Sequence, residues 1–158
     1  MKKLLVTLLI GFIILTGCSQ KTEEEPKEPE KTEYAVGETA TVGDIKITLK
    51  SFRYLEGDAY FKPDEGTKWI AVEFTFENTG KESTYIAGIF DLTMKDSEGY
   101  EKEQNIWGDL NGSVDGNVLP SEKLSGEKSF VITGSEEKLY VYYKPTFSTK
   151  DPIKFIVE

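Results

Sequence analysis

KWIAVEFTFENTG, at residues 68–80, alternates between two kinds of side chain. Ile70, Val72, Phe74 and Phe76 share one face at a period of two, and the intervening, mostly more polar residues share the other. Asn-Thr-Gly at the end of the segment is typical of a turn. This regular alternation predicts a central β-strand with one buried face. Burial of each of the four side chains contributes about 1.5–3 kcal/mol, so we expect this strand to anchor the core.

Further short segments on both sides of this strand show the same alternation and are separated by turn residues. They lie at residues 45–49, 90–94, 124–133, 139–143 and 153–157. A change of phase near Phe52 predicts a β-bulge. We expect residues 55–67 and 108–120 to form loops, and residues 100–107 to pair back against 90–94. The fold class is therefore all-β, a two-sheet antiparallel β-sandwich.

The composition excludes several kinds of site. The 158 residues contain no His, which excludes Ser-His-Asp and Cys-His nucleophiles and His-ligated metals. With one Cys, the chain cannot form an internal disulfide. The net charge of -9 disfavours nucleic acid and anionic lipid headgroups as partners of the folded part.

The N-terminus has the pattern of a secretory signal peptide over residues 1–17. Lys2 and Lys3 precede an apolar run at residues 4–15, which is short for a membrane-spanning helix. The following Leu-Thr-Gly-Cys, which ends at Gly17 and Cys18, resembles the lipobox of bacterial lipoproteins. The resemblance implies cleavage between these two residues and a diacylglycerol thioether, with further acyl chains such as palmitate, on the cysteine. The alternative is an ordinary signal peptide with an incidental Cys.

Residues 18–33 follow as a linker rich in Glu and Lys, with prolines at Pro26 and Pro29. A segment of this composition buries too little apolar surface to fold. We therefore expect a disordered acidic tether that begins with the lipidated cysteine, and a folded domain over residues 34–158.

Three parts of the folded domain together resemble a family of uncharacterised extracellular domains from lipoproteins of Gram-positive bacteria. They are residues 36–47, the strand at 68–80, and 90–92 with 125–130. The resemblance implies a telokin-like, immunoglobulin-like β-sandwich related to the mycobacterial immunoprotective extracellular antigen. It implies no catalytic residues. The family usually has Gly after the proline at position 120, whereas this chain has Ser121, which leaves the type of that turn open.

One loop is a candidate calcium site. Asp109, Asn111 and Asp115 place oxygen ligands close together in a Gly-rich segment, as a hard cation requires. However, Pro120 stands where an EF-hand loop has its bidentate Glu. Asn, Asp and Gly are also common turn formers, so an ordinary loop is the alternative.

A second candidate site is aromatic. In the segment at 139–143, Val141 and Tyr143 belong to the core face, which leaves Tyr140 and Tyr142 pointing outward. Together with the two Trp residues of the chain they could form a platform for carbohydrate or peptide. The alternative is cross-strand aromatic packing that stabilises the sheet.

These features predict a membrane-anchored lipoprotein on the extracellular face of the cell membrane, with a sandwich that serves as a binding or interaction module in the cell envelope. The alternative is a surface lipoprotein that binds a small ligand or calcium. We expect the membrane, through the anchor, and an envelope protein as partners, and no nucleic acid. We expect no cofactor beyond the covalent lipid and no enzymatic activity, because no pair of carboxylates is brought together by the sequence pattern.

Overall fold

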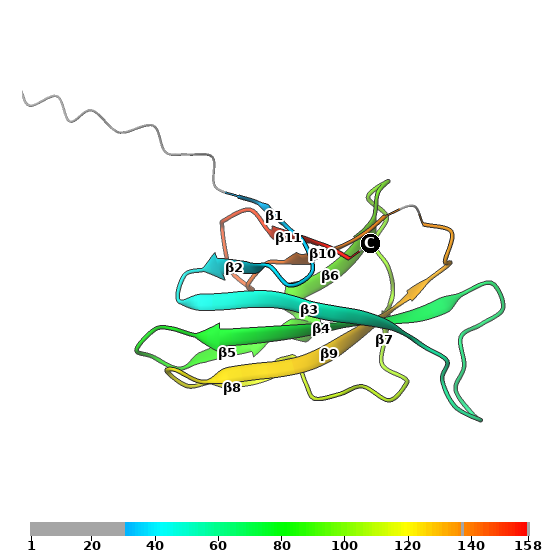
Figure 1. Cartoon of the computed structure of the whole chain (residues 1–158), viewed down its shortest axis with the longest axis horizontal. Helices are drawn as coiled ribbons and strands as arrows, with labels where there is room; N and C mark the ends of the chain where they lie inside the picture. Colours follow the sequence, from blue (N-terminus) through cyan, green and yellow to red (C-terminus); the bar gives the residue numbers. More distant parts are fainter. Residues whose placement is uncertain (1–30, 137, 158) are drawn as a thin grey trace, which may run out of the picture. The chain divides into compact units, whose positions relative to one another are not determined.

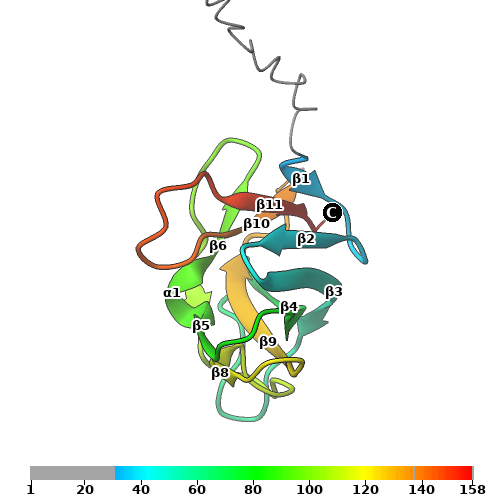
Figure 2. The same cartoon turned by 90° about the vertical axis from the view of Figure 1, so that its left-hand side faces the viewer.

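The computed structural model describes residues 31–136 and 138–157, so the predicted signal peptide, Cys18 and the linker up to residue 30 lie outside the described part. Two sheets form an immunoglobulin-like β-sandwich, as predicted (Figures 1 and 2). The β4 sheet has the order β2 (Thr39–Val42), β3 (Ile45–Leu55), β4 (Lys68–Asn78), β9 (Lys123–Ile132) and β7 (Gln104–Asn105). The β10 sheet has the order β1 (Glu33–Tyr34), β11 (Ile153–Ile156), β10 (Leu139–Tyr143) and β6 (Leu92–Asp96).

The strand predicted from residues 68–80 is the central strand of its sheet. β4 pairs antiparallel with β3 on one side and with β9 on the other. Its four alternating apolar side chains, from Ile70 to Phe76, are all fully buried. The predicted bulge lies in β3, where the register with β4 shifts between Leu49 and Ser51.

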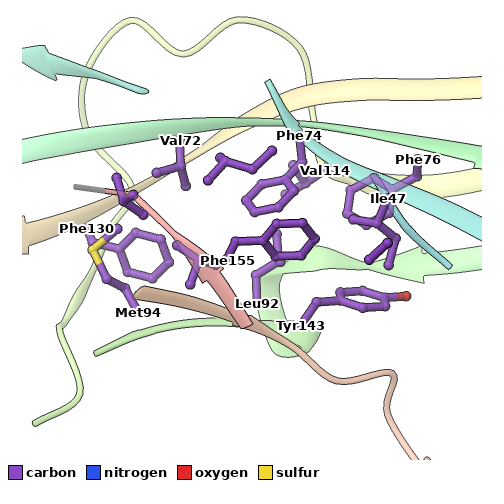
Figure 3. Close-up of a cluster of buried hydrophobic side chains, with 14 of the residues drawn as sticks. Ile47, Val72, Phe74, Phe76, Leu92, Met94, Val114, Phe130, Tyr143 and Phe155 are labelled. Carbon is purple, nitrogen blue, oxygen red and sulfur yellow. The ribbon is translucent and has the colours of Figure 1, made fainter. Parts of the chain in front are cut away.

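The core lies between the two sheets and is rich in aromatic rings (Figure 3). The Phe74 ring of β4 meets the Phe155 ring of β11 edge-on, with ring centres 5.4 Å apart. Phe76 contacts Tyr143 of β10 across the sandwich with tilted rings, whose centres are 5.6 Å apart. Since both pairs join the β4 sheet to the β10 sheet, the aromatic side chains hold the two layers together.

Residues 31–33, which precede the predicted domain, make contacts with the sandwich. β1 pairs in parallel with β11, and the Lys154 N–H donates to the Thr32 carbonyl at 3.0 Å. The Lys154 amine also forms an ion pair with Glu33. Backbone hydrogen bonding and strand pairing thus join Thr32 and Glu33 to β11, although this segment is polar. No helix in the described residues is long and apolar enough to cross a bilayer.

The predicted strand at residues 90–94 is wrong in its first part. Residues Gly88–Asp91 form the short helix α1, and β6 begins only at Leu92. Gly88 packs so closely on Val114 that an added Cβ would lie 2.5 Å from the valine side chain. The turn therefore needs glycine at this point, and it leaves Phe90 76% exposed instead of in the core.

Two further predictions are corrected by pairings between distant segments. β8 (Asp115–Val118) lies within the predicted 108–120 loop and pairs with β5 (Thr84–Ala87). The predicted pairing of residues 100–107 with the preceding strand is right only in its first part. Residues 100–102 pair with β6 through the Lys95–Glu101 bridge, the Asp96 N–H bond to the Tyr100 carbonyl and the Lys102 N–H bond to the Met94 carbonyl, after which β7 crosses to β9 in the other sheet. The polar residues of β8 are typical of turns, and their strand conformation depends on the partner strand.

The second face of β4 is also partly covered, although only one buried face was predicted. Trp69 and Ala71 are buried on this face with Leu55 of β3, and Leu110 packs against them. Arg53 fixes the loop that carries Leu110, because its guanidinium donates to the Asp109 carbonyl at 2.6 Å.

The turn before β9 keeps the geometry that a glycine would provide. The Glu122 N–H donates to the Leu119 carbonyl at 3.0 Å, with Pro120 and Ser121 between them. Ser121 has a φ of 66°, so a proline followed by a left-handed residue makes this a type II turn. The open question about this turn is settled: the type is that of Pro-Gly, with serine in the strained position.

A half-buried ion-pair cluster joins the turn after β9 to the end of β6. The Lys102 amine lies 2.7 Å from Asp96 and 3.1 Å from Glu136. The Glu136 carboxylate also accepts the Thr133 N–H at 2.9 Å and the Gly134 N–H at 2.7 Å. Burial alone raises the pKa of Glu136, but hydrogen bonds from the Thr133 N–H and the Lys102 amine outweigh this effect and lower its pKa to about 2.

This cluster predicts a loss of stability in acid. The unfolded carboxyl has a pKa of about 4.3, so the unfolded state binds more protons below that value and the stabilisation is lost as the pH falls towards 2. We expect the wild type to lose up to about 3 kcal/mol more of its free energy of unfolding than Glu136→Gln between pH 5 and pH 2. Urea denaturation at several pH values measures this difference. Parallel pH profiles for the two proteins would contradict the assignment.

Candidate functional site

The three predicted calcium ligands take part in contacts within the protein. The Asp109 carbonyl binds Arg53, and the Asn111 N–H donates to the Glu127 carboxylate at 2.8 Å. Asp115 lies in β8, where its carboxylate accepts the Ile89 N–H at 3.2 Å. In residues 31–136 and 138–157 no group of three or more His, Cys, Asp or Glu side chains is placed to hold a metal ion.

The predicted aromatic residues are divided between the two sheets. Tyr140 and Tyr142 lie half-buried on the outer face of β10, as expected from the alternation. The Lys154 amine lies 3.9 Å from the Tyr140 ring centre, and the Lys95 amine lies 5.8 Å from that of Tyr142. Trp69 is buried against the other sheet.

Trp107 does not join these tyrosines either. Its ring stacks on Phe61, with centres 4.0 Å apart and planes 6° from parallel. A single platform made of the two tyrosines and the two tryptophans is therefore wrong, because these residues belong to different sheets and loops.

Tyr142 instead lines a groove of about 590 Å³. The walls are α1, β6 and the loop that connects β10 to β11, which projects on the same side as α1 in Figure 2. We call residues 144–152 the 144–152 loop. The groove presents three aromatic rings, two prolines and two lysines: Phe90, Tyr142, Phe147, Pro145, Pro152, Lys95 and Lys144.

Asp91 joins the two walls of this groove. Its carboxylate is buried and accepts the Thr146 N–H at 2.7 Å and the Thr146 hydroxyl at 2.6 Å. The Asp91 carbonyl accepts the Lys144 N–H at 2.9 Å. A charged acceptor makes such hydrogen bonds strong, so the 144–152 loop is fixed to the end of α1.

Lys128 of β9 holds α1 in place through hydrogen bonds to its backbone. Its amine donates to the carbonyls of Gly88, Ile89 and Leu92 at 2.9, 2.9 and 2.6 Å. Burial lowers the pKa of Lys128 to about 8, against the opposing effect of the Asp115 and Asp91 carboxylates. Below that pH the amine is charged and has the three protons that the three carbonyls require.

Phe147 is the most unusual residue of the groove. Its side chain is fully exposed, and its φ of 69° lies in the left-handed region. A bulky side chain in this region costs about 1–2 kcal/mol of stability, and a fully exposed ring contributes no free energy of burial to offset this cost. Strain combined with an exposed aromatic ring indicates a role for Phe147 outside the folded core.

We expect Phe147→Gly to raise the free energy of unfolding by about 0.5–1 kcal/mol, because glycine adopts the left-handed region without strain but gains entropy in the unfolded chain. Ser121→Gly serves as the matched substitution, since Ser121 has a similar φ of 66° in a turn away from the groove. Urea denaturation measures both effects. A loss of stability in Phe147→Gly alone would show that the ring supports the fold.

The groove is basic within an acidic chain. Lys95 and Lys144 form no ion pair with any of the described residues, whereas the whole chain has a net charge of -9. Asp91 is the only described carboxylate that lines the groove, and Thr146 already occupies it. The groove therefore offers apolar contact and positive charge together.

Sequence reasoning missed Phe90, Asp91, Phe147 and Lys128 as parts of this site. A signal was present only for Lys128. Lys128 lies on the same face of its strand as Phe130 and Ile132, and the alternation of the segment at residues 124–133 predicts that this face is buried. The pattern therefore places a lysine on a buried face. A buried lysine needs acceptors and is a reason to look for them.

Solved structures share the fold at low identity. The yjhA protein from Bacillus subtilis matches with a TM-score of 0.62 and 16% identity, over 79% of this chain and 99% of that one. The "putative lipoprotein (ycdA)" from Bacillus subtilis matches with a TM-score of 0.61 and 16% identity, over 76% of this chain and 38% of its own. MPT63, a secreted protein from Mycobacterium tuberculosis, matches with a TM-score of 0.52 and 15% identity, over 80% of this chain and 95% of that one.

These likenesses confirm the β-sandwich that the sequence predicted, and the mycobacterial secreted protein shares this fold. No curated protein matches the chain. The family described as "Domain of unknown function (DUF4352)" matches residues 34–153, which is most of the chain and nearly all of the described sandwich. The chain therefore belongs to the DUF4352 family.

Proposed function

We propose that this protein is a lipid-anchored binding module on the extracellular face of the cell membrane, and that its binding site is the groove between α1 and the 144–152 loop. The observation that carries the proposal is Phe147, an aromatic ring held in solvent by a strained backbone at the groove. Binding surfaces are enriched in such exposed aromatic side chains.

Binding is favoured over catalysis by the same groove. Catalysis without His requires carboxylates or other groups free to exchange protons with a substrate. The only described carboxylate that lines the groove, that of Asp91, is buried and hydrogen-bonded to Thr146. The rings and amines around it are suited to hold a partner.

The proposed location rests on the lipobox-like sequence and on the structural neighbours. The Leu-Thr-Gly-Cys motif places the only Cys of the chain at the position that would be lipidated. Of the neighbours, ycdA has a lipoprotein name and MPT63 is named as a secreted protein. Several acyl chains on Cys18 would anchor the protein stably, whereas one chain would not.

The anchor is tested by Cys18→Ala, with radiolabelled palmitate and membrane fractionation as the two readouts. We expect the wild type to carry label and to sediment with membranes, and Cys18→Ala to carry none and to leave the membrane fraction. Cys18→Ala that remains labelled and membrane-bound would contradict lipidation at this residue.

The binding site is tested by a photo-crosslinking amino acid introduced in place of Phe147 in the full-length protein, in its own cells. The same amino acid in place of Tyr85, an exposed aromatic residue of β5 outside the groove, is the control. We expect a reproducible crosslinked envelope component from position 147 that position 85 does not give. Identical products, or none, from both positions would rule out the groove as the binding site.

A further inference from the structure

We infer that the groove takes an acidic protein segment with an aromatic or aliphatic side chain between or beside its carboxylates. This inference rests on the proposed function, since it names the partner of the same groove. Three features support the inference: the charge of the groove, the apolar surface of its walls, and the hydrogen bonds already made at the free edge of β6.

Charge complementarity gives the first half of the inference. Lys95 and Lys144 both line the groove and have no acidic partner among the described residues. The Lys95 side chain lines the groove, and its amine lies 5.8 Å from the centre of the Tyr142 ring. Two unpaired amines in a site with apolar walls favour a ligand that supplies carboxylates or other anions.

The apolar walls give the second half. Phe90 is 76% exposed and Phe147 is fully exposed, and two prolines lie beside them. A polyanion of repeating phosphates and hydroxyls would leave these rings in water, whereas a protein segment can cover them with its own side chains. A volume of about 590 Å³ is in the range that accommodates a few side chains.

The segment binds through its side chains and does not extend the sheet. β6 is the outer strand of the β10 sheet, and its free edge would otherwise be open to an added strand. The Leu92 carbonyl is already bound by Lys128, and the Met94 carbonyl accepts the Lys102 N–H at 2.8 Å. With this edge occupied, a partner contacts the outer face, where the rings and amines lie.

The test is selection of a phage-displayed library of random linear peptides on the full-length protein in detergent micelles. We expect the selected peptides to combine Asp or Glu with aromatic or aliphatic residues. Their affinity should fall about tenfold or more in the Lys95→Gln/Lys144→Gln double variant and in Phe147→Gly, and should fall with added salt. Two controls should leave the affinity unchanged. Lys81→Gln removes a lysine charge at an exposed site outside the groove, and Ser121→Gly places glycine at another exposed position of positive φ.

Three outcomes would overturn the inference. The first is selected peptides that are neutral or basic, or no selected peptide at all. The second is equal binding to the wild type and to the lysine double variant. The third is displacement of the peptides by polyphosphate together with polyphosphate binding that does not depend on Phe147, which would assign the groove to a polyanion.

Crosslinking at position 147 separates the failure of this inference from the failure of the proposed function. A specific crosslink to a wall polymer, or to a protein whose crosslinked segment is not acidic, overturns the inference and leaves the groove as a binding site. The absence of both a specific crosslink and a selected peptide overturns the two together.

Discussion

Phe74→Ala is expected to lower the free energy of unfolding by about 3–5 kcal/mol, a large part of the 5–15 kcal/mol of an ordinary domain. Phe74 is fully buried in the central strand and meets Phe155 of the opposite sheet edge-on. Removal of its ring leaves a cavity between the two layers, and it removes a contact that joins them (Figure 3). Urea denaturation at neutral pH measures the effect.

Phe147→Ala is the matched control for this substitution, because it removes the same ring from a fully exposed site. We expect a change of less than about 0.5 kcal/mol there. The slope of the free energy with urea should stay the same in both variants, which shows that the unfolding transition has not changed. Equal losses at positions 74 and 147 would contradict the assignment of the core.

Lys128→Met is expected to lower the free energy of unfolding at pH 7 by about 3 kcal/mol. Methionine matches the length of the lysine side chain but removes its hydrogen bonds to the carbonyls of Gly88, Ile89 and Leu92. The Gly88 carbonyl keeps the Leu92 N–H as a donor, and the Ile89 carbonyl keeps the Gln104 side chain. Each hydrogen bond from a charged donor contributes about 1.5–3 kcal/mol, and relief of the buried charge offsets part of the total that is lost. Since α1 carries Phe90, partner binding should weaken as well. Lys81→Met, at an exposed position, is the control.

The effect of Lys128→Met should increase with pH. The folded lysine releases its proton near its lowered pKa of about 8, whereas the unfolded one keeps it to about 10.4. The unfolded state therefore binds more protons between these values, and the stability contributed by Lys128 rises there. We expect the difference between the wild type and Lys128→Met to widen from pH 8 to pH 10. A constant difference would contradict a buried amine of lowered pKa.

Most of the sheet framework could be predicted because its strands have one face in a core. Alternation in β4 and β10 follows directly from burial on one side, so the pattern in the sequence reports the structure. β8 has no such pattern, because Asp115, Gly116 and Asn117 form a strand only by pairing with β5. Its position depends on contacts with a distant segment that no local pattern records.

The groove was less predictable than the framework. Tyr142 was expected to point outward from the alternation, and it does so. Phe90 continued the alternation of Leu92 and Met94 and was placed in the core for that reason. The chain instead turns at Gly88 and places Phe90 outside, through the bonds that Lys128 makes to distant carbonyls. Phe147 lies between turn residues, where no periodicity exists to indicate its exposure.

The parallel pairing of β1 with β11 has a mechanical consequence. A pulling force applied to the chain at Lys31 acts first on β1, which is only two residues long and is joined to its sheet along one side. β1 would peel away before β2 is loaded, and residues 31–36, which precede the Gly37 N–H bond to the Leu49 carbonyl, would then extend by roughly 3.3–3.6 Å each. The contact between the Tyr34 and Phe155 rings would be lost, whereas the contact between Phe74 and Phe155 across the two sheets would remain. A load on this end of the described chain would therefore release the two-residue strand first, before the long strands of the β4 sheet.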